Sequence, residues 1–135
     1  MVANVISMFE AAMVWRQENQ VDRILWTYSF PEYKEVMKHY PFFYHGVDKK
    51  GHPVIITRVG HIDSEQLFNV TTLERMQRFF VYFHELFIHL RLPACSKFAG
   101  KRVDQMLCIY DFSGFTMSTL SKKSLELLNF GLKTG

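Results

Sequence analysis

The spacing of apolar residues predicts that the first third of the chain is helical. Between residues 4 and 17, apolar side chains recur at helical spacing on one face. A short element over residues 21–25 follows, and Pro31 either ends this element or begins a further helix over residues 32–38. These segments are short, so we expect a small helical lobe at the start of the fold.

A longer helix is predicted in the middle of the chain. Thr71 and Glu74 form the pattern of a capping box, and the helix is expected to continue to about Arg91, with Pro93 ending it. Its apolar stripe is wide enough to cover a sheet or to line a cavity. The stripe consists of Met76, Phe79, Phe80, Phe83, Phe87 and Leu90. Residues 94–102 are expected to form a connecting loop.

Residues 42–47 and 53–59 are predicted to form an antiparallel hairpin. The turn over residues 48–51 ends in a glycine, which suits a position of positive φ. Pro53 occupies the first position of the return strand, where a missing backbone donor is tolerated. Residues 60–69 are expected to form a loop or a short helix.

A short apolar run over residues 106–110 is predicted to be a central strand. The run has no polar alternation, which is typical of a strand that is buried on both faces. Cys108 lies within it and is expected to be a small buried hydrophobe. Asp111 is expected to cap a turn after the strand, and Gly114 gives that turn its conformational freedom.

Two hydroxyl side chains follow this turn. If the backbone is extended, Thr116 and Ser118 point to the same side. They are candidates either for capping the next helix or for binding a ligand beyond the carboxyl end of the strand. The final helix is predicted from about Leu120, and its apolar residues are Leu125, Leu127, Leu128 and Leu132. Strands and helices together predict a mixed α/β fold.

Composition narrows the choice of protein class. The chain has 135 residues, of which 48% are apolar and 16% aromatic, so a packed core is expected and long disorder is not. Its 13 Phe residues fill a core or line an apolar cavity. The formal net charge is +3 without any run of five like charges, which does not indicate a nucleic-acid-binding arm but is compatible with transient attraction to anionic membranes. Two unpatterned cysteines favour a reducing cytosol.

The motifs of common enzyme classes are incomplete. His84, Glu85 and His89 suggest a zinc-protease helix, but the two histidines are five positions apart, which turns the second about 140° away from the first. The sequence over residues 111–114 suggests the magnesium-binding turn of kinases, but the accompanying kinase motifs are missing. We therefore expect a protein that is not an enzyme and has no metal site or catalytic cofactor.

Several short motifs, taken in order, resemble the CRAL-TRIO lipid-binding family. Those that resemble its amino-terminal helical lobe are Met8-Phe9-Glu10, Trp15-Arg16, Val21-Asp22 and Ile24-Leu25. Those that resemble its first hairpin are Tyr40-Pro41, residues 46–51 and Pro53-Val54. The Arg-Leu-Pro-Ala-Cys-Ser sequence over residues 91–96 and the strand ending in Asp111 are similar to phosphatidylinositol/phosphatidylcholine transfer proteins. The similarity spans nearly the whole chain.

The resemblance implies a fold and a function. Residues 1–39 would be the end of the helical amino-terminal lobe, and residues 40–135 the amino-terminal half of an α/β/α lipid-binding sandwich with a mixed sheet. The family holds one lipid in an apolar pocket, and transfers it between membranes or presents phosphatidylinositol to lipid kinases. We expect one bound phospholipid, phosphatidylinositol or phosphatidylcholine, as the ligand. The expected partners are a transient membrane surface and a lipid kinase, without nucleic acid, and the expected location is cytoplasmic and peripheral at Golgi or endosomal membranes.

The resemblance also suggests candidate site residues. In phosphatidylcholine-binding relatives, small hydroxyls that follow the glycine of the strand–turn motif contact the phosphocholine, which implies headgroup contacts for Thr116 and Ser118. Phe79, Phe83 and Phe87 are candidates for lining the acyl cavity, with ordinary core packing as the alternative. A cavity of this kind binds strongly because each buried methylene contributes about 0.8 kcal/mol.

Two features depart from the family. His52 stands where relatives often carry Arg, and it is a weaker cation whose charge depends on pH. The resemblance implies that the basic segment before the first helix, the later strands and the gate helix lie outside these 135 residues, and that the family's inositol-phosphate contacts lie mainly in those parts. We therefore expect the 135-residue chain, expressed alone, to expose a strand edge and to aggregate or remain molten.

Two alternative functions are compatible with the sequence. One is a module of the same fold that senses lipid and regulates a partner protein, which transfer of labelled lipid between vesicles would distinguish. The other is a fragment of a small α/β hydrolase or kinase, which a catalytic motif in downstream sequence would favour.

Overall fold

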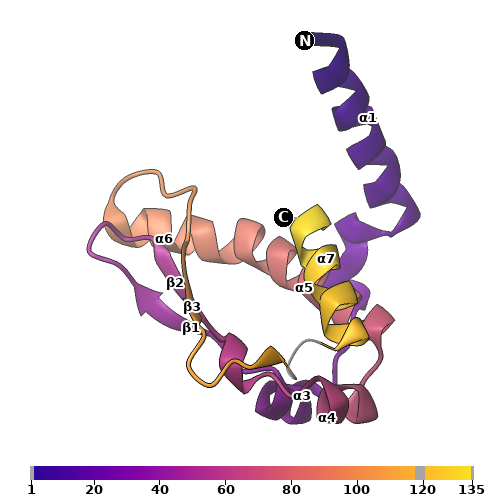
Figure 1. The fold of residues 1–135 in the computed structure, drawn as a ribbon. Helices are drawn as coiled ribbons and strands as arrows, with labels where there is room; N and C mark the ends of the chain where they lie inside the picture. The colour runs from indigo at the N-terminus through magenta and orange to yellow at the C-terminus, as the bar shows by residue number, and fades with distance from the viewer. Residues whose placement is uncertain (1, 118–120, 135) are drawn as a thin grey trace.

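The computed structural model describes residues 2–117 and 121–134 as a mixed α/β structure, which confirms the predicted fold class (Figure 1). The helices and strands are, in chain order, α1 (Val2–Glu18), the 3₁₀ helix η1 (Val21–Arg23), α2 (Ile24–Thr27), α3 (Tyr33–His39), β1 (Phe42–Val47), β2 (Pro53–Arg58), the 3₁₀ helix η2 (Val59–His61), α4 (Ser64–Val70), α5 (Leu73–Leu86), the π-helix η3 (Phe87–Arg91), α6 (Leu92–Ala99), β3 (Leu107–Asp111) and α7 (Lys122–Thr134).

The predicted amino-terminal helix is confirmed as α1, which projects away from the rest of the fold (Figure 1). Most of its large apolar side chains are exposed. The contact that ties its end to α5 is polar, because the Arg16 guanidinium donates to both carboxylate oxygens of Glu85, at 2.8 and 3.0 Å. Among the described residues, Glu85 is the one charged residue that is buried.

The predicted antiparallel hairpin is confirmed as β1 and β2, with a bulge in β1 at His45. The Asp48 carboxylate closes the turn by accepting from the backbone N–H groups of Lys50 and His52, each at 2.8 Å. Gly51 has a φ of +90°, and a Cβ at this position would lie 2.7 Å from the Cβ of Ala99. Both the positive φ and this close approach to α6 require glycine.

The predicted strand over residues 106–110 is confirmed as β3, but in the described sheet it is neither central nor buried on both faces. Its position at the edge agrees with the expectation that this chain exposes a strand edge. The strand order is β1-β2-β3, so β2 is central, and β3 pairs with it in parallel as the edge strand of the described sheet. Leu107, Ile109 and Tyr110 are 43%, 44% and 59% exposed, and Cys108 is also exposed rather than buried. A continuous apolar run reports the tendency of a strand to be buried, but burial also requires neighbours on both edges.

The start and the end of the long helix also differ from prediction. Its N-cap is Thr72, whose hydroxyl accepts from the Arg75 N–H at 3.2 Å, whereas Thr71 donates its hydroxyl proton to the Glu32 carboxylate. Pro93 does not end the helix, because it lies in the first turn of α6, where a missing N–H is tolerated. The π-helix η3 joins α5 to α6, so the predicted loop over residues 94–102 is mostly helical.

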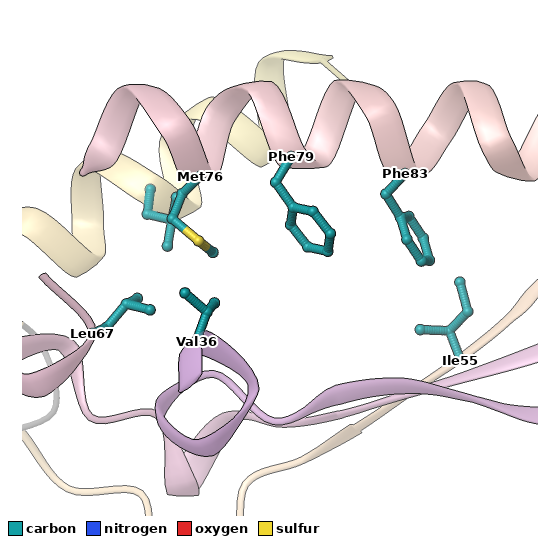
Figure 2. Packing of buried hydrophobic residues seen from close by; sticks show 7 residues of the cluster. Val36, Ile55, Leu67, Met76, Phe79 and Phe83 are labelled. Atoms are coloured by element: carbon teal, nitrogen blue, oxygen red, sulfur yellow. The ribbon is translucent and has the colours of Figure 1, made fainter. Parts of the chain in front are cut away.

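The core lies between α5 and the layer formed by the hairpin with α3 and α4. Figure 2 shows Met76, Phe79 and Phe83 pointing from α5 across this interface. They face Val36 on α3, Leu67 on α4 and Ile55 on β2, and the cluster also includes Leu127 of α7. The apolar stripe is therefore buried along α5, but Leu90 in the π-helix is 59% exposed, since the wider turn rotates later residues out of the stripe.

We predict that Leu67→Ala destabilises the full-length protein by about 2 to 5 kcal/mol, because it leaves a cavity in this core. Leu67 is 0% exposed. Leu90→Ala makes the same chemical change at the exposed position and should change stability by about 0.5 kcal/mol or less. Urea unfolding of both variants checks this, and equal losses at the two positions would contradict the placement of the core.

A second prediction concerns acid stability. The Arg75 guanidinium donates to both oxygens of Glu32, and its hydrogen bonds lower the pKa of Glu32 to about 2 from an ordinary value of 4.5. Because the folded pKa is depressed, the stabilisation is present above the ordinary pKa and is lost as the pH falls from about 5 towards 2. Glu32→Gln should remove on the order of 2 kcal/mol at pH 7 and flatten this acid dependence. Glu126→Gln, at an exposed position, should leave the unfolding free energy and its pH profile unchanged.

Candidate functional site

An aromatic pocket of about 330 Å³ lies between α5, β1 and the segment that links α2 to α3. Seven of its nine lining side chains are aromatic, and the other two are Leu86 and Arg91. The aromatic residues are Tyr28, Phe30, Tyr33, Tyr44, Phe79, Tyr82 and Phe83. A concave, mostly apolar surface with few polar groups is typical of a small-molecule site.

Direct ring contacts hold the walls of the pocket in place. On one wall, the ring centroid of Phe83 lies 4.4 Å from that of Phe42 and 4.9 Å from that of Tyr44. On the other wall, the rings of Phe30 and Phe79 stack at 4.9 Å. Such pairs favour fixed geometries, so the cavity is largely preformed rather than created by a ligand.

The polar end of the pocket is formed by Arg91 and Tyr44. The Arg91 guanidinium carbon lies 4.0 Å from the centroid of the Tyr44 ring, in a cation–π contact. The Tyr44 hydroxyl is buried and has no hydrogen-bond partner among the described residues, and burial raises the pKa of this phenol. A buried hydroxyl without a partner is costly. The arrangement therefore offers the Arg91 guanidinium, above the Tyr44 ring, to a ligand that carries acceptor oxygens.

The π-helix η3 explains how Arg91 reaches the pocket. A π-turn adds a residue to the helix and redirects the side chains that follow it, and such turns are frequent at functional sites. In η3, the Arg91 guanidinium lies over the Tyr44 ring, and the His89 Nε2 lies 3.3 Å from a carboxylate oxygen of Glu85. One irregular segment thus serves both the pocket and the attachment of α1.

The structure separates the residues that the sequence suggested for the site. Phe79 and Phe83 line the pocket, whereas Phe87 is buried and stacks on Tyr44 with a centroid distance of 6.4 Å. Thr116 is exposed and is not part of the pocket lining, and Ser118 lies outside the described residues. Helix α7 is instead capped by the Ser121 hydroxyl, which accepts from the Ser124 N–H at 3.1 Å.

Asp111 is confirmed as the residue that caps the turn after β3. Its carboxylate accepts from the Ser113 N–H at 2.9 Å, and this hydrogen-bonded contact with Ser113 lowers the pKa of Asp111. A carboxylate oxygen also lies 3.7 Å from the Arg58 Nε. These contacts give Asp111 a structural role at the end of β3.

Sequence reasoning missed Tyr44 and Arg91. Both residues belong to motifs that the sequence analysis considered, Tyr44 in the first strand of the hairpin and Arg91 at the start of the Arg-Leu-Pro segment. Neither pattern indicated that the two side chains would meet, because the residues are far apart along the chain and the π-helix was not foreseen.

Two further observations on the described residues bear on the site. No group of three or more His, Cys, Asp or Glu side chains in the described part of the chain is arranged to hold a metal ion. Among the helices over residues 2–117 and 121–134, none is both long enough and apolar enough to cross a membrane.

Comparison with known proteins confirms the family that the motifs suggested. Residues 37–134 match the CRAL/TRIO domain, so the chain belongs to the CRAL/TRIO family. It is 39% identical over 126 residues to the phosphatidylinositol/phosphatidylcholine transfer protein SFH7 of Arabidopsis thaliana, covering 93% of the chain and 23% of that protein. It is 37% identical over 115 residues to the SEC14 cytosolic factor of Kluyveromyces lactis, covering 85% of the chain and 38% of that protein. The chain thus spans between about a fifth and two fifths of the length of such relatives.

Proposed function

We propose that the protein binds a single phospholipid, phosphatidylinositol or phosphatidylcholine, and transfers it between membranes or presents it there. The observation that carries this proposal is the preformed aromatic pocket with Arg91 at its polar end. Membership of the CRAL/TRIO family and the activity in the name of the Arabidopsis relative support it. The bound phospholipid is the only ligand that the proposal requires, and no covalent change is catalysed.

The chemistry of the pocket suits one part of a phospholipid. The ring walls accept acyl methylenes, each contributing about 0.8 kcal/mol. The Arg91 guanidinium donates to a phosphate or ester oxygen. A volume of about 330 Å³ is at the lower end for ligand sites, so the pocket holds only a portion of the lipid. The remainder would contact other surfaces of the full-length protein.

The partners follow from the same proposal. A protein that carries one lipid must bind a donor membrane and then an acceptor membrane. Its partners are therefore a transient membrane surface and, where phosphatidylinositol is presented, a lipid kinase. We place this activity in the cytoplasm, at the surface of Golgi or endosomal membranes. Mass spectrometry of the lipids that co-purify with the full-length protein is the direct test, and a preparation that carries no phospholipid would contradict the proposal.

We predict that filling the pocket reduces lipid binding. Leu86→Trp places a large ring at the pocket wall, so the amount of co-purified phospholipid should fall several-fold while the protein stays folded, as measured by mass spectrometry and thermal melting. Ile88→Trp is the matched control, because Ile88 is exposed two positions further along the helix and does not line the pocket. A normal lipid load in the Leu86 variant would show that the lipid lies elsewhere.

A further prediction separates two candidate headgroup sites. If Thr116 and Ser118 contact the headgroup, the double Ala variant should lose phosphatidylcholine transfer but keep its fold, because each hydrogen bond to a charged phosphate contributes roughly 1.5 to 3 kcal/mol. If Arg91 contacts it, Arg91→Met should lose transfer instead, since Met retains much of the apolar stem. Transfer of labelled phosphatidylcholine between vesicles compares the two variants. Unchanged transfer in either one removes that site from the proposal.

A further inference from the structure

The hairpin turn and the end of α6 form one continuous surface. Gly51 lies against Ala99, and Figure 1 shows the β1–β2 turn beside the end of α6. We call residues 48–52 and 97–104 together the basic tip. Its five basic side chains are all exposed, and they are Lys49, Lys50, Lys97, Lys101 and Arg102.

The basic tip holds the entire net positive charge of the chain. The whole sequence has 16 Lys and Arg residues and 13 Asp and Glu residues. The basic tip contains five of the former and two of the latter, Asp48 and Asp104, which leaves eleven of each sign on the rest of the chain. The formal net charge of +3 is therefore local, so an anionic surface is attracted to this end of the molecule rather than to the molecule in general.

The two acidic residues of the basic tip are already engaged. Asp48 accepts from two backbone N–H groups and lies 2.8 Å from the Nδ1 atom of His52. Asp104 pairs with Arg102 at 3.1 Å in an exposed ion pair, which is weak and leaves the guanidinium accessible. Neither carboxylate therefore shields the four lysines.

Both loops of the basic tip are held in a defined conformation. The Ser96 hydroxyl accepts from the Val103 N–H at 2.9 Å and lies within donating distance of the Leu92 and Val103 carbonyls. Val103 is buried, and Gly100 caps α6 in the left-handed conformation. The lysines are thus displayed from a rigid scaffold, which reduces the entropy lost on binding.

An exposed aromatic ring lies among these charges. Phe98 is 80% exposed and follows Lys97 directly. Met106 and Leu107, where the chain leaves the basic tip and enters β3, are also exposed apolar residues. Lysines around apolar side chains are typical of surfaces that lie in the headgroup region of a membrane, with the apolar groups inserted and the cations on the lipid phosphates. Nucleic-acid surfaces instead combine a basic groove with several stacking aromatics.

We propose that the basic tip is the surface by which the protein docks on anionic membranes, with Phe98 inserted between the lipid headgroups. The inference builds on the proposed function in one respect, namely that a lipid-transfer protein must contact a membrane, and it assigns that contact to residues outside the pocket. Electrostatic attraction brings the basic tip to the surface, and insertion of the ring supplies the part of the binding that salt does not screen.

Co-sedimentation of the full-length protein with vesicles tests the docking surface. The vesicles are phosphatidylcholine alone or phosphatidylcholine with about 30 mol% phosphatidylserine. Neutralising three lysines, by Lys49→Gln, Lys50→Gln and Lys101→Gln, should weaken binding to the anionic vesicles by about 100-fold, at about fivefold for each charge. The matched control removes the same net charge elsewhere through Lys34→Gln, Lys38→Gln and Lys122→Gln, and should stay within about twofold of the unmodified protein.

A second variant tests the inserted ring. Phe98→Ser should leave binding at low salt nearly intact and abolish the binding that persists at high salt, because it removes apolar insertion but no charge. A Phe98 variant with the salt dependence of the unmodified protein would overturn the insertion.

The outcomes separate the docking surface from the proposed lipid binding. The lysine and Phe98 variants should retain their co-purified phospholipid, since none of these residues lines the pocket. Equal loss in the matched control, or tight binding of RNA without binding of anionic vesicles, would overturn the docking surface. Vesicle binding by a protein that carries no phospholipid would instead contradict the proposed function and leave the docking surface standing.

Discussion

The packing of α5 across the β1–β2 hairpin is the interaction on which the rest of the structure depends. Phe83 contacts Phe42 and Tyr44 of β1, and Phe79 contacts Phe30 in the segment before α3. These rings bury the apolar face of α5. They bring the amino-terminal helical lobe, the β1–β2 hairpin and α5 to one interface. A parallel pairing of β2 with β3 requires a long crossover, and α5 with α6 provides it.

The same packing creates the pocket. The rings in this interface stack or tilt against one another, which are the geometries that aromatic pairs prefer, and a space remains beside Phe79 and Phe83. The π-helix η3 ends in Arg91, whose guanidinium lies over the Tyr44 ring at one end of that space. Apolar walls with a polar end match an amphiphilic ligand. The basic tip lies on other residues, so ligand binding and membrane contact are assigned to different parts of the chain.

Local features of the fold could be predicted from the sequence because their causes are local. The hairpin follows from its glycine turn and β-branched return strand, and Asp111 caps its turn with a neighbouring N–H. Helical spacing predicted α1, and the stripe on α5 predicted which face would be buried, because periodicity reports a face directly. Membership of the CRAL/TRIO family was likewise recognisable from short motifs in a fixed order.

Tertiary structure decided the features that depend on which segments meet. Whether the apolar strand is central or at the edge depends on its neighbours, so Cys108 is exposed although its own pattern suggested burial. Thr71 does not cap α5, because its hydroxyl donates to the carboxylate of Glu32, a residue of another segment. The pocket end formed by Tyr44 and Arg91 exists only after a strand and an irregular helix have packed together. Spacing along a chain encodes which face of an element is apolar, but it does not encode which partner that face will find.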